Sequence, residues 1–232
     1  DYLVRKFNQQ QNQNNVVFSA NDVFSQKQKV VSINATDGIE FQEILYNYGD
    51  WIYSQFDSLI NMKIWDNIVK KAKNKDIQKL ILEKFDIYIF IQEDYQIINE
   101  KVDFLWIGRG YPYRWIVISK FNKSNLSNPS NTWIQLDSLI SSKMPDLKIN
   151  ESLRTNYVTT INGIKTYILR GVYDHLVSDT GGPFIIYLFE IDGKSDLFLA
   201  GGFANNPGGK KSFLIRKLEN IIEKIKFKEK HE

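Results

Sequence analysis

The chain has 232 residues, 43% of them hydrophobic and 25% charged, which is the composition of a globular protein with a sizeable core. The 30 basic and 27 acidic residues are mixed along the chain, and the resulting net charge of +3 argues against a nucleic-acid-binding protein. The absence of cysteine excludes disulfides, thiol nucleophiles and cysteine-ligated metals. Aromatic residues make up 14% of the chain, which favours strands and leaves a carbohydrate-stacking surface open.

The first half of the chain combines one long amphipathic segment with short apolar runs. Apolar residues recur at helical spacing from Phe41 to about Ala72, and Thr36-Asp37 in front of them is a typical helix N-cap. A shorter helix is predicted over Ile77–Phe85. The apolar runs predict strands over residues 29–34, 87–91, 104–107 and 115–119.

The second half is predicted to form antiparallel strands followed by one helix. Asn162-Gly163 separates the apolar runs 157–161 and 165–173, and Asn-Gly is the strongest short signal for a β-hairpin. Asp192-Gly193 separates the runs 183–191 and 196–203 in the same way. From Lys211 to Lys226, apolar residues at helical spacing predict a helix that buries one stripe, made of Leu214, Leu218, Ile221, Ile222 and Ile225.

The order of these elements predicts an α+β fold, with antiparallel sheet packed against helices on one side, either as a single unit or as two related lobes. An Asn- and Ser-rich stretch at 122–131 marks a connection. We therefore expect an N-terminal α+β lobe with the long helix at 1–121, and a connection with a short helix at 122–156. Antiparallel strands and the terminal helix make up 157–232.

The predicted loop between strands 104–107 and 115–119 carries arginines among aromatic residues and is the first candidate binding site. It contains Arg109, Tyr111, Tyr113 and Arg114. Arginines beside aromatic rings are typical of recognition surfaces. Strand alternation is the competing explanation, because Arg114 and its neighbour Trp115 would simply face opposite sides of a sheet.

A second candidate site surrounds the turn that contains Thr180, Gly181 and Gly182. Two glycines before a proline permit positive φ or the close approach of a ligand, although a tight entry into a strand explains them as well. Arg170 lies in an apolar strand, with Asp174 four residues further on. We expect either a structural ion pair or an arginine clamp for a carboxylate or phosphate.

The glycine-rich loop before the last helix is the third candidate. Free N–H groups at a helix N-terminus, with Lys210 beside them, can hold an anion, while glycines that only turn the chain are the structural alternative. Phosphate-loop and dinucleotide fingerprints are absent, so no cofactor is predicted. Two histidines without cysteines predict no metal site, and catalytic residues stay unidentified.

Several of these motifs resemble those of domain-of-unknown-function family 4837, which are envelope lipoproteins of Bacteroidetes-type bacteria. The resemblance is carried by KTYILRG at 165–171, GGPFIIY at 181–187, the Gly202-Phe203 and Pro207-Gly208 pairs, and the last helix through Arg216, Leu218 and Glu219. It implies a periplasm-facing or surface protein tethered by a lipidated cysteine in a segment upstream of Asp1. It implies no catalytic residues.

The leading hypothesis is therefore a non-catalytic envelope module with a binding or structural role. Its partner would be an envelope protein, a glycan or a small ligand at loops 109–114 and 180–182, without nucleic acid, and the membrane would be reached only through the N-terminal anchor. The alternative is a hydrolase that acts on an envelope polymer through acidic residues, so enzymatic activity stays open. A third hypothesis is a cytoplasmic sensor that holds an anion at 208–211.

Overall fold

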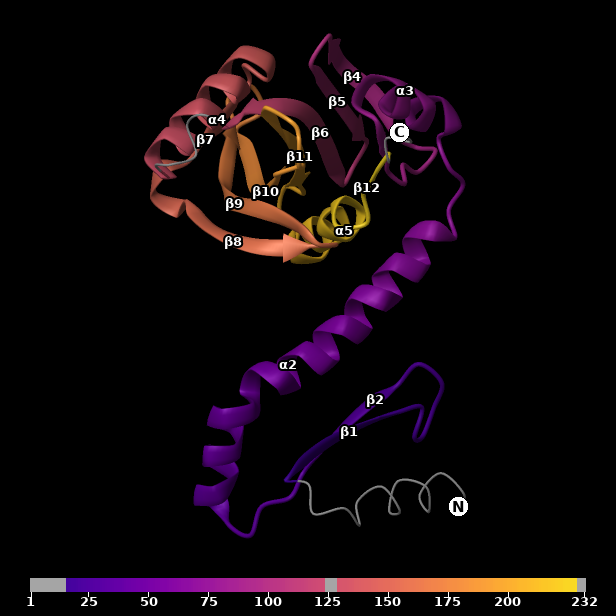
Figure 1. The fold of residues 1–232 in the computed structure, drawn as a ribbon, viewed down its shortest axis with the longest axis vertical. Coiled ribbons are helices and arrows are strands. Elements are labelled where there is room, and N and C mark those ends of the chain that lie inside the picture. The colour runs from indigo at the N-terminus through magenta and orange to yellow at the C-terminus, as the bar shows by residue number, and fades with distance from the viewer. Residues whose placement is uncertain (1–15, 124–128, 229–232) are drawn as a thin grey trace. The chain divides into compact units, whose positions relative to one another are not determined.

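The structure, a computed structural model, describes residues 16–123 and 129–228 (Figure 1). The chain divides into two compact units, residues 1–67 and 68–232. The division into parts 1–121, 122–156 and 157–232 stays a prediction from the sequence. One antiparallel sheet, however, contains strands from both sides of it.

The first unit is a β-hairpin beside a long helix. Strands β1 (Val17–Asn21) and β2 (Lys29–Ile33) pair antiparallel, and helix α2 spans Gly38–Val69. Asp37 caps this helix by accepting hydrogen bonds from the backbone N–H groups of Ile39 and Glu40. The Oγ of Ser19 donates to Gln55 over 3.1 Å, so the hairpin is tied to the helix by side-chain contacts.

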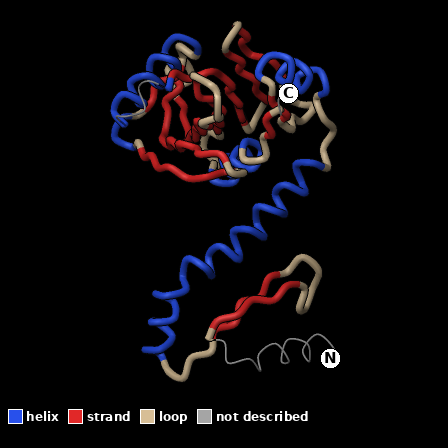
Figure 2. The backbone as a smooth tube through the Cα atoms, viewed as in Figure 1, coloured by secondary structure: helices blue, strands red, loops and turns tan. Residues whose placement is uncertain are grey.

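The second unit is built on an eight-stranded antiparallel sheet in the order β4-β5-β6-β11-β10-β9-β7, with β8 also paired to β9 (Figures 1 and 2). The bounds of its strands are β4 (Gln96–Lys101), β5 (Phe104–Arg109), β6 (Tyr113–Asn122), β7 (Leu147–Ile149), β8 (Thr155–Ile161), β9 (Ile164–His175), β10 (Thr180–Phe189) and β11 (Asp196–Asn205). The hairpin turn between β8 and β9 has positive φ at Asn162 and Gly163, as the sequence predicts.

Helix α4 (Pro129–Lys143) covers one face of the sheet. Side chains that alternate along β6, β10 and β11 form a buried cluster with the helix, including Val117, Ile186 and Leu199 against Leu136 and Ile140. Close packing of this kind is the main source of stability in a domain of this size.

Helix α5 (Ser212–Ile222) covers the other face and buries the stripe predicted from its spacing. Leu218 is fully buried, and a Cβ added at Gly202 on β11 would lie 2.7 Å from its Cβ, so the helix and the strand are in close contact. The expectation of helices on one side of the sheet was wrong. Both faces of the inner strands are apolar, and a single layer of helices would leave one of them in water.

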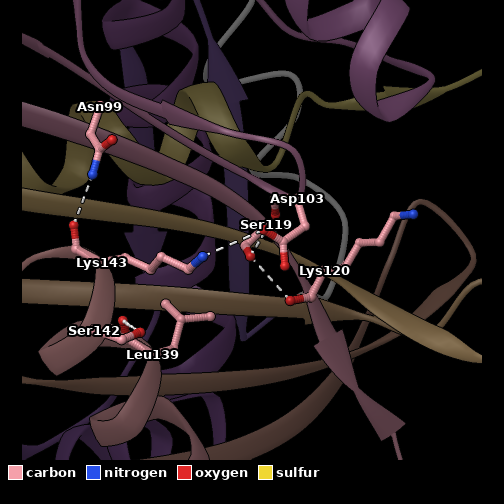
Figure 3. Close-up of polar contacts among 7 residues, drawn as sticks. All are labelled: Asn99, Asp103, Ser119, Lys120, Leu139, Ser142 and Lys143. Atoms are coloured by element: carbon pink, nitrogen blue, oxygen red, sulfur yellow. Dashed lines mark hydrogen bonds and ion pairs between the residues drawn. The ribbon is translucent and has the colours of Figure 1, made fainter.

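Polar contacts fix the end of α4 to the sheet (Figure 3). Asn99 on β4 donates to the backbone carbonyl of Lys143 over 3.1 Å and so satisfies one of the free carbonyls at the end of the helix. The Nζ of Lys143 lies 3.6 Å from the carboxylate of Asp103 in the β4–β5 turn. The buried Ser119 donates to the carbonyl of the same Asp103 over 2.9 Å, which joins β6 to that turn.

Four short elements complete the part of the second unit that the structure describes. Helix α3 (Lys75–Phe85) begins at Asn74, whose side chain accepts from the N–H of Ile77. Strands β3 (Ile87–Tyr88) and β12 (Lys226–Phe227) pair antiparallel, and a 3₁₀ turn, η2, spans Glu151–Leu153. The predicted α+β class, with antiparallel sheet and packing helices, is confirmed.

Candidate functional site

The candidate site is a group of cationic side chains on the α5 face of the sheet, beside the turn where β5 ends and β6 begins. Arg114 on β6 alternates with Trp115, which packs on the α4 face, so its guanidinium points to the side that α5 covers. Only 6% of Arg114 is exposed. A cation buried to this extent normally has a carboxylate partner.

Arg114 has no such partner among the described residues. Its Nε is buried without a hydrogen bond, and no ion pair or hydrogen bond reaches its guanidinium from the described part of the chain. Leaving a buried charged group unsatisfied costs several kcal/mol in general. Such a group in a folded protein calls for an explanation, for example a bound water, an ion or a ligand.

A second arginine lies directly opposite. Arg109 on β5 is the register partner of Arg114, and like charges across a strand pair destabilise a sheet. One arm of Arg109 forms an ion pair with Asp94, with 2.6 Å between Nη2 and Oδ2, while its Nε is buried without a partner. A single carboxylate therefore faces two guanidinium groups.

Lys217 and Tyr95 complete the group. Lys217 on α5 is half-buried, stacks its ammonium on the ring of Phe213 at 4.6 Å from the centroid, and forms no ion pair within the described residues. Tyr95 is 1% exposed, and its hydroxyl has no hydrogen-bond partner in the described chain. We call Tyr95, Arg109, Arg114 and Lys217 the cation cluster.

The pKa shifts report the same crowding of positive charge. Burial lowers the pKa of Arg114, and the charge of Arg109 adds to this effect. Burial also lowers the pKa of Lys217, with Arg114 and Arg109 contributing. Burial raises the pKa of Tyr95 to about 12, so its hydroxyl stays protonated and can donate a hydrogen bond. The cation cluster therefore offers several donors and excess positive charge to a ligand.

Arg170, the other predicted arginine, lies on β9 and has a different environment, beside Glu219 of α5. Its Nη1 lies 2.7 Å from the Oε1 of Glu219, and its Nη2 lies 3.4 Å from the hydroxyl of Tyr157. Burial raises the pKa of Glu219, although the charge of Arg170 opposes this shift. Asp174, its expected partner, is exposed on β9 in register with Gly181. The ion pair is thus structural, but with a carboxylate from the helix.

The Thr180 site lies on the opposite face of the sheet from the cation cluster. Asn205, the register partner of Tyr113, donates to the Oγ1 of Thr180 over 2.8 Å. A Cβ added at Gly181 would lie 2.3 Å from the carbonyl of Tyr173, so close approach of a neighbouring strand explains this glycine.

Gly182 has the same explanation, because an added Cβ would lie 1.9 Å from the carbonyl of Ala204. The two predicted loops thus share one end of the sheet but do not form one site.

The remaining predicted residues are exposed. Tyr111 and Tyr113 form an edge-to-face pair with 6.0 Å between ring centroids, and 66% of Tyr111 is exposed. Lys210 is exposed in the loop before α5, and its carbonyl accepts from Asn206 over 3.2 Å. These residues could contact a partner, but none of them is a buried group without a partner.

Sequence reasoning found the two arginines of the cation cluster and missed the other two members. Lys217 lies three residues after Leu214 and four before Ile221, so it borders the apolar stripe of α5, and that position was the available signal. Tyr95 lies in a polar stretch without periodicity, and nothing local indicates that it is buried.

Comparison with known proteins identifies the family. Residues 74–224 match the family described as domain of unknown function DUF4837. The chain belongs to this family. The DUF4837 match starts just before α3 and ends just after α5, so it includes all four members of the cation cluster. The comparison with curated proteins found no match.

Two solved structures have a similar arrangement. The Ran-binding protein Mog1p of Saccharomyces cerevisiae is 6% identical, with a TM-score of 0.41, over 62% of this chain and 90% of Mog1p. LpqN of Mycobacterium tuberculosis, involved in cell envelope biogenesis, is 14% identical, with a TM-score of 0.36, over 60% of this chain and 81% of LpqN.

Within residues 16–123 and 129–228, no group of three or more His, Asp or Glu side chains is placed to hold a metal ion. No helix in the same residues is both long and apolar enough to span a bilayer.

Proposed function

We propose that this protein is a non-catalytic binding module of the cell envelope that captures a ligand or partner through an anionic group. The observation that carries the proposal is Arg114, a buried guanidinium without a carboxylate partner in the described chain, beside Arg109 and Lys217. A cation held in this way is stabilised when a ligand brings the missing negative charge. The envelope location rests on the family resemblance alone.

The hydrolase alternative has less support. Glu219 and Glu223 are neighbouring carboxylates near the end of α5, and acid–base chemistry would need at least one of them to face a substrate. Instead, Arg170 pairs with Glu219, and the buried Tyr187 donates to Glu223 over 2.9 Å. Both carboxylates are thus engaged by the protein itself.

The proposal is tested by ligand capture and recovery. The wild-type chain and an Arg114→Met variant are incubated with small molecules extracted from the envelope fraction, and the retained compounds are identified by mass spectrometry. We expect anionic compounds that the wild type retains and the variant does not, recovered chemically unchanged. Equal retention by the variant would contradict the assigned site, and conversion of the retained compound to a product would contradict a non-catalytic role.

A further inference from the structure

We propose that the group bound at the cation cluster is a phosphate, carried either by a soluble phosphate monoester or by a lipid headgroup. This inference rests on the proposed binding function and adds the chemical class of the ligand. Three properties of the cation cluster support it: its charge, its hydrogen-bond donors and their burial.

The charge of the cluster calls for more than one negative charge. Arg109, Arg114 and Lys217 supply three cations, and Asp94, paired to Arg109, is the one carboxylate that forms an ion pair with any of them among the described residues. The charge of Lys71 also contributes to the lowered pKa of Lys217. A ligand carboxylate brings one negative charge, whereas a phosphate monoester brings about 1.5 to 2 at neutral pH.

The number of donors also suits the three oxygens of a phosphate better than the two oxygens of a carboxylate. The Nε groups of Arg109 and Arg114 are both buried without hydrogen bonds among the described residues, and the hydroxyl of Tyr95 is a third unpaired donor. The ammonium of Lys217 adds a fourth group. A phosphate monoester has three strongly accepting oxygens besides the ester oxygen, whereas a carboxylate has two oxygens.

Burial distinguishes this cluster from ordinary basic surface. Arg114 and Tyr95 are 94% and 99% buried, given exposed fractions of 6% and 1%. A charge-assisted hydrogen bond is stronger in such a site than in water, because the surrounding dielectric constant is low. The lysines near the end of α2, in contrast, are exposed.

The test measures binding of defined anions to the wild-type chain. Inorganic phosphate, glycerol 3-phosphate, acetate and chloride are titrated at matched ionic strength, and unfolding temperature and calorimetry report binding. In a parallel arm, vesicles of phosphatidylcholine with and without phosphatidic acid are sedimented with the protein. We expect binding of a phosphate, and the two arms separate the soluble source from the lipid source.

Three variants locate the binding site. We expect Arg114→Met and Lys217→Met to weaken phosphate binding at least about tenfold, the effect of losing about 1.4 kcal/mol of interaction. Arg154→Met is the matched control, because Arg154 already pairs with Asp137 over 2.8 Å. This control is expected to bind phosphate as the wild type does.

Each contrary outcome has a defined meaning. Acetate that binds as tightly as phosphate, and depends on Arg114, would overturn the phosphate assignment and leave the proposed anion-binding function standing. Phosphate that binds equally well to Arg114→Met would overturn the phosphate site. Absence of any binding in both arms, at anion concentrations up to about 100 times a millimolar Kd, would contradict the site and the proposed function together.

Discussion

Arg114 and Arg170 leave the sheet on the same face, and α5 passes over both, but only Arg170 has a carboxylate partner among the described residues. Glu219 neutralises Arg170 from the helix. Near Arg114 the same helix instead presents Lys217, a further positive charge. The difference shows that the fold can neutralise a strand arginine from α5, so the lack of a partner at Arg114 calls for an explanation other than poor packing.

The largest effect is expected from the residue that holds α5 over both arginines. Leu218 is fully buried against β11, and truncation there leaves a cavity under the helix. We expect Leu218→Ala to lower the free energy of unfolding by about 2–5 kcal/mol, measured by denaturant titration. A free energy of unfolding unchanged within error would show that the packing of α5 does not depend on this stripe. It would also remove the basis for comparing Arg114 with Arg170.

The ion pair between Arg170 and Glu219 is tested by Arg170→Met. This change leaves the carboxylate of Glu219, which is 15% exposed, without its cation. We expect a loss of about 1–2 kcal/mol in the free energy of unfolding, because a mostly buried carboxylate becomes unpaired. Adding Glu219→Gln should recover part of that loss. If Arg170→Met has no effect, the ion pair does not contribute to stability.

At the cation cluster, the free energy of unfolding is expected to change in the opposite direction. Arg114→Met removes a buried charge and keeps most of the side-chain volume, so without ligand it should raise the free energy of unfolding by about 1 kcal/mol. The same denaturant titration as for Arg170→Met gives a direct comparison. A clear destabilisation by Arg114→Met would mean that the guanidinium has a structural role after all.

The smallest effect on the free energy of unfolding is expected at Glu190, whose carboxylate pairs with Lys123 and Lys165. Hydrogen bonds from Lys123 and Lys165 lower the pKa of Glu190 from 4.5 to about 2. Its contribution to stability is therefore complete above pH 4.5 and is lost as the pH falls toward 2, because the unfolded chain takes up the proton first.

We expect Glu190→Gln to cost about 0.5–1 kcal/mol at pH 7 and nothing at pH 2, by unfolding experiments at both pH values. A cost that is equal at both pH values would mean that the carboxylate charge is not involved.

The regular parts of the fold could be predicted from the sequence because their signals are local. The Asn162-Gly163 turn and the apolar stripe of α5 each predict one structure, and both are present. Strand β4 is absent from the strands predicted from the sequence, since its residues are mostly exposed and its register shifts between Ile97 and Asn99. A polar edge strand has no periodic apolar signal, and only its partner strand defines it.

The site was predictable only in part for the same reason. Arg109 and Arg114 are close in sequence, and the hairpin brings them into register. The partner of Arg170 comes from a helix about 50 residues away in the chain (170 against 219). Lys217 joins the cluster from about 100 residues beyond Arg114 (217 against 114), whereas Tyr95 lies about 20 residues before Arg114 in a stretch without a periodic signal. Contacts of this kind depend on the packing of α5, which spacing in the sequence does not reveal.

The most direct test of the central claim is NMR of the arginine side chains during a phosphate titration. In protein labelled with ¹⁵N-arginine, the Nε–H signals of Arg114 and Arg170 are assigned from the Arg114→Met and Arg170→Met spectra. The account predicts that the Arg114 signal moves with saturable dependence on phosphate while the Arg170 signal stays in place. Equal movement of both signals, or a fixed Arg114 signal at saturating phosphate, would contradict it.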